Sequence, residues 1–122
     1  MTTRKKAGFL GRVRKAYGDR EVPLPEMKTT VTVKALTEAE SQAIEGKFII
    51  PASKPGGRAD VDERMAKNTL IVACCYDAAG NRLFDEDDIE TLDTELPGKV
   101  YKLLAAEALR ANGYLEDAEG NS

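Results

Sequence analysis

The chain has 122 residues, 42% of them hydrophobic, which is enough for one domain with a single core. No apolar run approaches the roughly 20 residues that a helix needs to cross a bilayer, so we do not expect a membrane protein. The net charge is −3, there is no histidine, and the two cysteines are adjacent, which argues against histidine-based catalysis and a disulfide-stapled fold.

The first expected element is a basic amphipathic arm over residues 1–19. Seven basic residues against a single acidic one give residues 1–20 a net charge of +6, so the remainder carries −9. A helix is predicted over residues 5–17, although Gly8 and Gly11 weaken it by roughly 1 kcal/mol each relative to alanine. Such an arm needs a partner to order it, and the candidate partner-binding residues are its apolar ones: Phe9, Leu10, Val13 and Tyr17.

A β-hairpin is predicted over residues 20–35. In both halves of this segment valine and leucine alternate with other residues, a period typical of strands with one buried face. Pro23 and Pro25 lack a backbone N–H, so the first strand should lie at the edge of a sheet. We expect the chain to turn near residues 26–28.

A short helix and a loop should follow the hairpin. Thr37 and Glu40 have the spacing of a capping box, which predicts a helix to about Glu45 that Gly46 ends. Residues 51–59 are rich in proline and glycine and are expected to form a mobile loop. The residues that this helix is expected to bury are Ala39, Ala43 and Ile44.

Residues 68–76 contain the densest apolar run. Its shortness and its isoleucine, valine and tyrosine favour a buried central strand over a helix, and residues 60–67 could add a helical turn before it. On such a strand Cys74 and Cys75 point to opposite faces and do not bridge each other, so we expect both to be packing residues.

A tight hairpin loop over residues 77–81 and a short returning strand over residues 82–84 are expected next. A helix over residues 85–94 should follow, capped by Asp85, with its acidic first turn placed favourably for the helix dipole. The inward-facing residues of this helix are expected to be Ile89 and Leu92.

The clearest element is a final helix over residues 97–112. Pro97 suits the first helical position, and Asn112 with Gly113 is a strong end signal. Residues 115–122 are predicted to be an acidic, disordered tail. The apolar stripe of the helix consists of Val100, Leu103, Leu104, Ala108 and Ala111.

These elements predict an α+β fold in a single domain over residues 20–114. A small, mostly antiparallel sheet from residues 20–35 and 68–84 should pack against three or four helices. The predicted helices cover residues 37–45, 85–94 and 97–112.

No catalytic or metal-binding constellation stands out in the sequence. The lack of histidine removes the commonest general base, the usual catalytic triads and most zinc sites. The acidic run at 85–88 lies at a predicted helix start and lacks the spacing of a calcium loop, and the run at 54–58 lacks the spacing of a P-loop. We therefore expect no enzyme activity, cofactor, metal or small-molecule substrate.

Nucleic-acid binding is disfavoured. Only the basic arm could contact phosphates, and the acidic body would repel a duplex. Docking of the arm on a protein partner or a neighbouring copy is the preferred interpretation. The basic residues 1–6 are followed by no apolar stretch of signal-peptide length, so we expect no secretion, and a reducing cytoplasm suits the cysteines.

Three short patterns occur in order along residues 20–114. A valine-rich strand enters the Leu-Thr-Glu-Ala-Glu of residues 36–40, the run at 77–84 has the form Asp-x-x-Gly-x-x-Leu-Phe, and Ala-Asn-Gly at 111–113 closes the last helix. In their order and spacing these patterns resemble the tail assembly chaperones of long-tailed bacteriophages and prophages.

The resemblance implies a non-enzymatic role. Such chaperones coat the long, hydrophobic tape measure protein, keep it extended and soluble, help recruit the major tail tube protein, and leave before the virion is complete. It implies a location in the host cytoplasm, absence from the mature virion, and self-association. Two alternatives stay open: a structural or adaptor protein of the head–tail or tail region, and a nucleic-acid-binding accessory protein.

Overall fold

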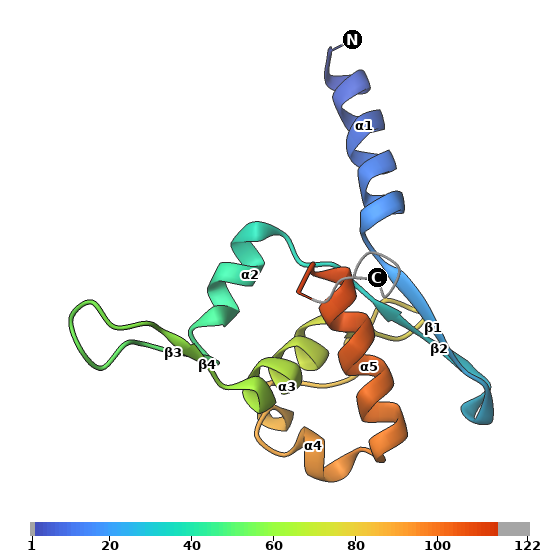
Figure 1. The fold of residues 1–122 in the computed structure, drawn as a ribbon. Helices are drawn as coiled ribbons and strands as arrows, with labels where there is room; N and C mark the ends of the chain where they lie inside the picture. The colour runs from blue at the N-terminus through green and yellow to red at the C-terminus, as the bar shows by residue number, and fades with distance from the viewer. Residues whose placement is uncertain (1, 115–122) are drawn as a thin grey trace, which may run out of the picture.

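The computed structural model describes residues 2–114, with side chains for residues 8–13 and 15–114, so the predicted tail of residues 115–122 lies outside the described residues. Within them, five α-helices accompany a three-stranded antiparallel sheet and a two-stranded ribbon (Figure 1). The predicted α+β fold is confirmed. In this described part of the chain, no helix is both long and apolar enough to span a membrane.

The predicted hairpin forms the main part of the sheet. Strand β1 (Arg20–Leu24) pairs antiparallel with β2 (Thr29–Val33), and Val22 lies opposite Val31, so both valines face the core. A 3-10 helix (Pro25–Met27) makes the turn at the expected place.

Strand β5 (Cys75–Tyr76) completes the sheet by pairing with the other side of β2. The strand order is therefore β1-β2-β5, and β1 is an edge strand, as its prolines predicted. The returning strand predicted over residues 82–84 is reduced to one bridge, between Arg82 and Tyr76, because β5 itself is only two residues long.

The central strand predicted over residues 68–76 is wrong for residues 68–74, and its last two residues form the short strand β5. The chain forms helix α3 (Glu63–Cys74) there, and Asp62 caps that helix by accepting a hydrogen bond from the amide of Met65. Because most sides of α3 are buried, polar residues do not recur along it at the helical spacing of an exposed face. The sequence therefore lacked the pattern that would have indicated a helix. Its buried residues are Ala66, Asn68, Thr69, Leu70, Ile71, Val72 and Cys74.

The two cysteines are buried packing residues, as expected, but they do not share a strand. Cys74 ends α3 and Cys75 begins β5, and neither forms a disulfide. Burial raises the pKa of Cys74 to about 11 and that of Cys75 to about 12, so both thiols stay protonated at neutral pH.

Helix α5 (Gly98–Ala111) confirms the final predicted helix and packs against α3, β1 and β2. Pro97 lies just before the first helical residue rather than within the helix. Leu103 departs from the predicted stripe: it is 37% exposed, and Ala105 is buried in its place. The other stripe residues are buried or half-buried: Val100, Leu104, Ala108 and Ala111.

Asn112 and Gly113 end α5, as predicted. Gly113 has a φ of 76°, a left-handed conformation that lets two amides bond back to carbonyls of the last turn. The Asn112 side chain accepts a hydrogen bond from the amide of Leu36 at 2.8 Å and donates to the carbonyl of Ala108 and the sulfur of Cys74. Asn112 thus joins the ends of α3 and α5 to the link that follows β2.

Helix α2 (Glu38–Glu45) has the predicted capping box between Thr37 and Glu40. Its predicted burial holds only in part: Ile44 is half-buried against the core, because α2 lies along the edge of the body (Figure 1). The two residues that are exposed instead are Ala39 and Ala43.

The two-stranded ribbon leaves the body after α2. Strand β3 (Ile49–Ile50) pairs antiparallel with β4 (Asp60–Val61), with Ile49 opposite Val61. Residues 51–59 form the loop between them, as predicted, and all are exposed.

The helix predicted over residues 85–94 is divided into a 3-10 helix (Glu86–Asp88) and helix α4 (Leu92–Glu95). The break has a physical cause: the carbonyls of Ile89 and Glu90 accept hydrogen bonds from side chains of α3. The predicted cap by Asp85 is confirmed, as is the burial of Ile89 and Leu92.

Candidate protein-binding site

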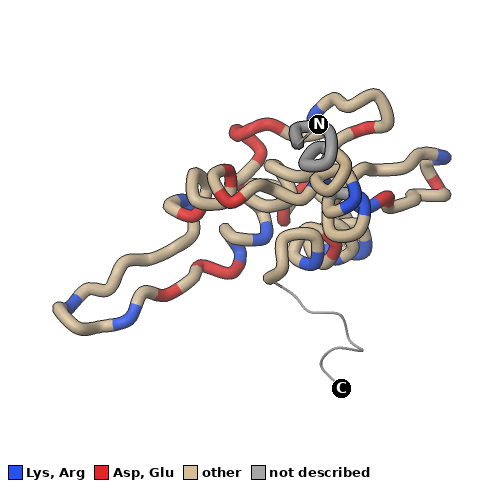
Figure 2. Tube along the Cα trace, turned by 90° about the horizontal axis from the view of Figure 1, so that it is seen from above, with Lys and Arg blue, Asp and Glu red and all other residues tan. Residues whose placement is uncertain are grey.

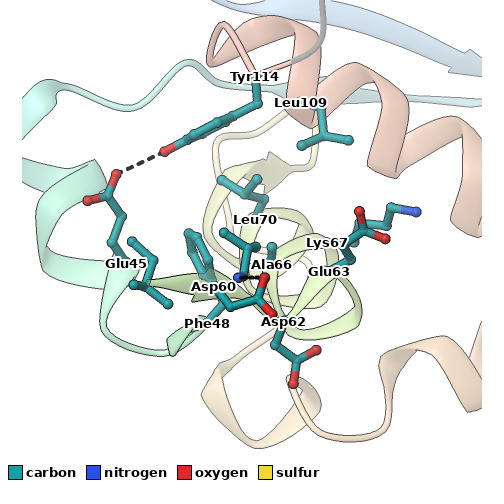
Figure 3. Close-up of a pocket in the computed structure, with 12 residues that line it drawn as sticks. Glu45, Phe48, Asp60, Asp62, Glu63, Ala66, Lys67, Leu70, Leu109 and Tyr114 are labelled. Carbon is teal, nitrogen blue, oxygen red and sulfur yellow. Dashed lines mark hydrogen bonds between the residues drawn. The ribbon is translucent and has the colours of Figure 1, made fainter. Parts of the chain in front are cut away.

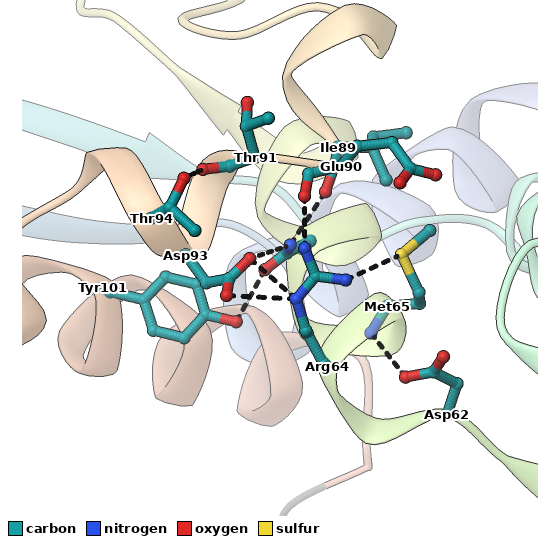
Figure 4. A network of polar contacts seen from close by, with 10 residues as sticks. Asp62, Arg64, Met65, Ile89, Glu90, Thr91, Asp93, Thr94 and Tyr101 are labelled. Carbon is teal, nitrogen blue, oxygen red and sulfur yellow. Dashed lines mark hydrogen bonds and ion pairs between the residues drawn. The ribbon is translucent and has the colours of Figure 1, made fainter.

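A polar network fixes the junction of α3, α4 and α5 (Figure 4). Asn68, fully buried, donates to the carbonyl of Ile89 and to Asp93 Oδ1, both at 2.8 Å, and accepts from the hydroxyl of Tyr101 at 2.7 Å. Arg64 Nε lies 3.0 Å from both carboxylate oxygens of Asp93. The hydrogen bond from Asn68 and then that from Arg64 hold the pKa of Asp93 below its usual range. The network thus joins α4 to α3 and α5.

A groove with mainly apolar walls lies between the β1–β2 hairpin and the start of α5. Its volume is about 390 Å³, and among the described residues that line it only Asp77 is charged. Met27 is 68% exposed and Leu83 41% exposed, so apolar surface of this groove faces solvent. We call this surface the apolar groove, formed mainly by Leu24, Met27, Leu83, Phe84, Leu96 and Val100.

A second groove lies where the ribbon, α2, α3 and the end of α5 meet (Figure 3). Its volume is about 860 Å³, and Phe48, Leu70 and Leu109 contribute apolar side chains. Val61 adds exposed apolar surface, with 48% of the residue accessible.

Acidic residues surround this second groove, which we call the acidic groove. Four carboxylates line it against the single ammonium group of Lys67, and Figure 2 shows acidic residues at the base of the ribbon. Tyr114 donates a hydrogen bond to Glu45 at 3.2 Å, and its pKa is raised by burial and by that bond. Neither these carboxylates nor any other cluster of acidic or cysteine side chains among the described residues is arranged to hold a metal ion. The four carboxylates belong to Glu45, Asp60, Asp62 and Glu63.

The candidate partner-binding residues of the arm lie on helix α1 (Thr2–Tyr17), which projects from the body (Figure 1). Phe9 is 58% exposed, Leu10 51% and Tyr17 79%, whereas Val13 is half-buried. Val13 and Tyr17 line a small hollow together with Leu36 at the base of the arm. The structure therefore leaves three of the four predicted residues accessible to a partner.

Sequence reasoning missed both grooves. The apolar groove combines residues that are up to 80 positions apart, from Leu24 to Leu104, and no local pattern connects them. The acidic groove had a weak local signal, because Phe48, Ile49 and Ile50 form an apolar run beside a loop of proline and glycine.

Comparison of the chain with protein-family models, with curated proteins and with solved structures finds no match. A functional hypothesis therefore depends on these surfaces and on the resemblance of the sequence patterns.

Proposed function

We propose that the protein is a non-enzymatic tail assembly chaperone of a long-tailed bacteriophage or prophage, acting in the host cytoplasm. In this proposal it binds the tape measure protein, keeps it soluble, and helps recruit the major tail tube protein. The observation that carries the proposal is the apolar groove, with its exposed Met27 and Leu83.

The chemistry of the apolar groove suits a long hydrophobic partner. An amphipathic helix binds by laying its apolar face in such a groove, and a nearly uncharged lining costs little desolvation. Met27 is flexible and polarizable, which lets one groove accept many different apolar side chains along a long chain. Below it, Leu104 is 2% exposed and belongs to the packed core, so the floor is rigid.

Co-expression with the tape measure protein tests the proposal. The wild-type chain should keep that protein in the soluble fraction, and Met27→Glu with Leu83→Glu should abolish this effect because the groove then carries two charges. Ile50→Glu is the matched control, since Ile50 is 49% exposed and lines neither groove. A folded double variant that protects the tape measure protein as well as wild type would contradict the proposal.

The fate of the protein separates this function from the structural alternative. We expect mass spectrometry to find the chain in infected or induced cells and not in purified virions. Stoichiometric retention in virions would instead favour a structural or adaptor component of the particle.

A further inference from the structure

Helix α1 presents apolar surface that its own body does not cover. Phe9 and Leu10 are each more than half exposed and lie beyond the small hollow that contacts Val13. An isolated helix of 16 residues is marginal in water, and Gly8 and Gly11 weaken this one further. The arm therefore gains order by packing on a partner.

The charge of α1 defines which partner fits. The sequence places six basic and no acidic residues between Thr2 and Tyr17, and Arg12 and Lys15 are exposed. The acidic groove offers the complement: apolar side chains surrounded by four carboxylates and one lysine. A cationic helix with apolar anchors matches this surface in both respects.

In the structure, the arm does not contact the acidic groove of its own chain. Only Gly18 and Asp19 separate α1 from β1, and two residues span about 7 Å at most. Arg20, which begins β1, is fixed to the body by an ion pair with Glu107 of α5. Figure 1 shows α1 and the ribbon leaving the body in different directions, and no described residue of α1 lines that groove.

We propose that α1 of one copy binds in the acidic groove of a second copy. Phe9 and Leu10 supply the apolar contacts, and Arg12 and Lys15 face the carboxylates of Asp60 and Glu63. Each copy has one arm and one groove on different surfaces, so the contact is head-to-tail and continues from copy to copy. This inference goes beyond tape measure binding and does not rest on it, because the apolar groove stays free.

Complementary charge reversals test the proposal. One variant changes the arm, Arg12→Glu with Lys15→Glu, and the other changes the groove, Asp60→Lys with Glu63→Lys. Light scattering coupled to gel filtration should show concentration-dependent oligomers for wild type and monomers for each variant. An equimolar mixture should associate again into oligomers in which the two variants alternate, because the unchanged arm fits the unchanged groove and the reversed arm fits the reversed groove.

The matched control reverses two exposed carboxylates that line neither groove, Glu86→Lys with Glu95→Lys, and should leave the oligomers unchanged. Raising the ionic strength from about 0.1 M to about 1 M shortens the Debye length from about 10 Å to about 3 Å and should dissociate wild type. Met27→Glu with Leu83→Glu should still oligomerise, which separates this contact from tape measure binding.

Several outcomes would overturn the proposal. They are a wild-type chain that stays monomeric at high concentration, a folded arm or groove variant with wild-type oligomers, and a mixture of folded variants that does not associate. If wild type were monomeric and shifted DNA or RNA in a gel, while the arm variant did not, the arm would bind nucleic acid instead.

Discussion

Helices α1 and α5 are similar in length, at 16 and 14 residues, yet their surroundings differ. Helix α5 packs on α3 and the sheet and buries Leu104, Ala105 and Ala108. Helix α1 stands apart from the body and leaves Phe9 and Leu10 in solvent (Figure 1).

The difference shows where the free energy of each helix comes from. Tertiary packing stabilises α5, whereas α1 depends on the intrinsic propensity of its residues until a partner covers it. Changes in the body should therefore alter global unfolding, and changes in the arm should alter only local order or association. The following experiments test this distinction, from the largest expected effect to the smallest.

Leu104→Ala should reduce the free energy of unfolding by about 2–5 kcal/mol, because it leaves a cavity beneath the apolar groove. Leu103→Ala is the matched control on the same helix, and since Leu103 is 37% exposed its cost should stay below about 1 kcal/mol. Urea denaturation followed by circular dichroism measures both. Equal losses would show that α5 is not packed as described.

Asn68→Ala should cost about 1–3 kcal/mol, because the hydroxyl of Tyr101 and the carbonyl of Ile89 lose their buried partner. Gln42→Ala removes an exposed amide on α2 and should leave the urea midpoint within experimental error. A neutral Asn68→Ala variant would mean that water replaces the amide and that the junction is less tightly packed.

The pH dependence of stability should include a contribution from Asp93. Its pKa in the folded protein is lowered, so its stabilising effect is present above the unfolded value of about 3.9 and is lost as pH falls through the folded value. Asp93→Asn should therefore flatten the acid limb of urea midpoints measured from pH 7 downward. Arg64→Gln should flatten it less, because the bond from Asn68 is the larger cause.

Gly8→Ala with Gly11→Ala should stabilise the helical form of the arm by about 1 kcal/mol per site and so increase its helicity. The urea midpoint of the body should not move. A Cβ at either position meets no other atom within 4 Å, so the change is sterically free. Gly113→Ala is the contrasting variant: its φ of 76° disfavours alanine, and the body should lose stability. A rise in the global midpoint from the arm variant would show that α1 folds together with the body.

Signals that lie close together in the sequence predicted the fold well. Alternation in residues 20–35, the capping box at Thr37 and the Asn112–Gly113 end of α5 are each decided within a few residues. Helix α3 was mispredicted because isoleucine and valine favour strands locally, while packing against α5 decides their conformation. The signal that could have found α3 was Asp62, which caps its first turn.

The candidate site was predictable only in part. The basic charge and the helical spacing of apolar residues in residues 1–19 predicted the arm, because that inference needs no long-range contact. The grooves depend on how the hairpin, ribbon and helices meet, and single-sequence patterns contain no such information.

Asn112 also has a consequence for biosynthesis. The amide of Leu36 finds its acceptor on a residue 76 positions later, and Arg20 finds Glu107 after 87 positions. A ribosome must therefore translate α5 before the β1–β2 hairpin acquires these contacts, and shorter nascent chains leave Cys74 and its neighbours unprotected. In a series of stalled chains, we expect thiol labelling to stop only when residue 112 has emerged from the exit tunnel.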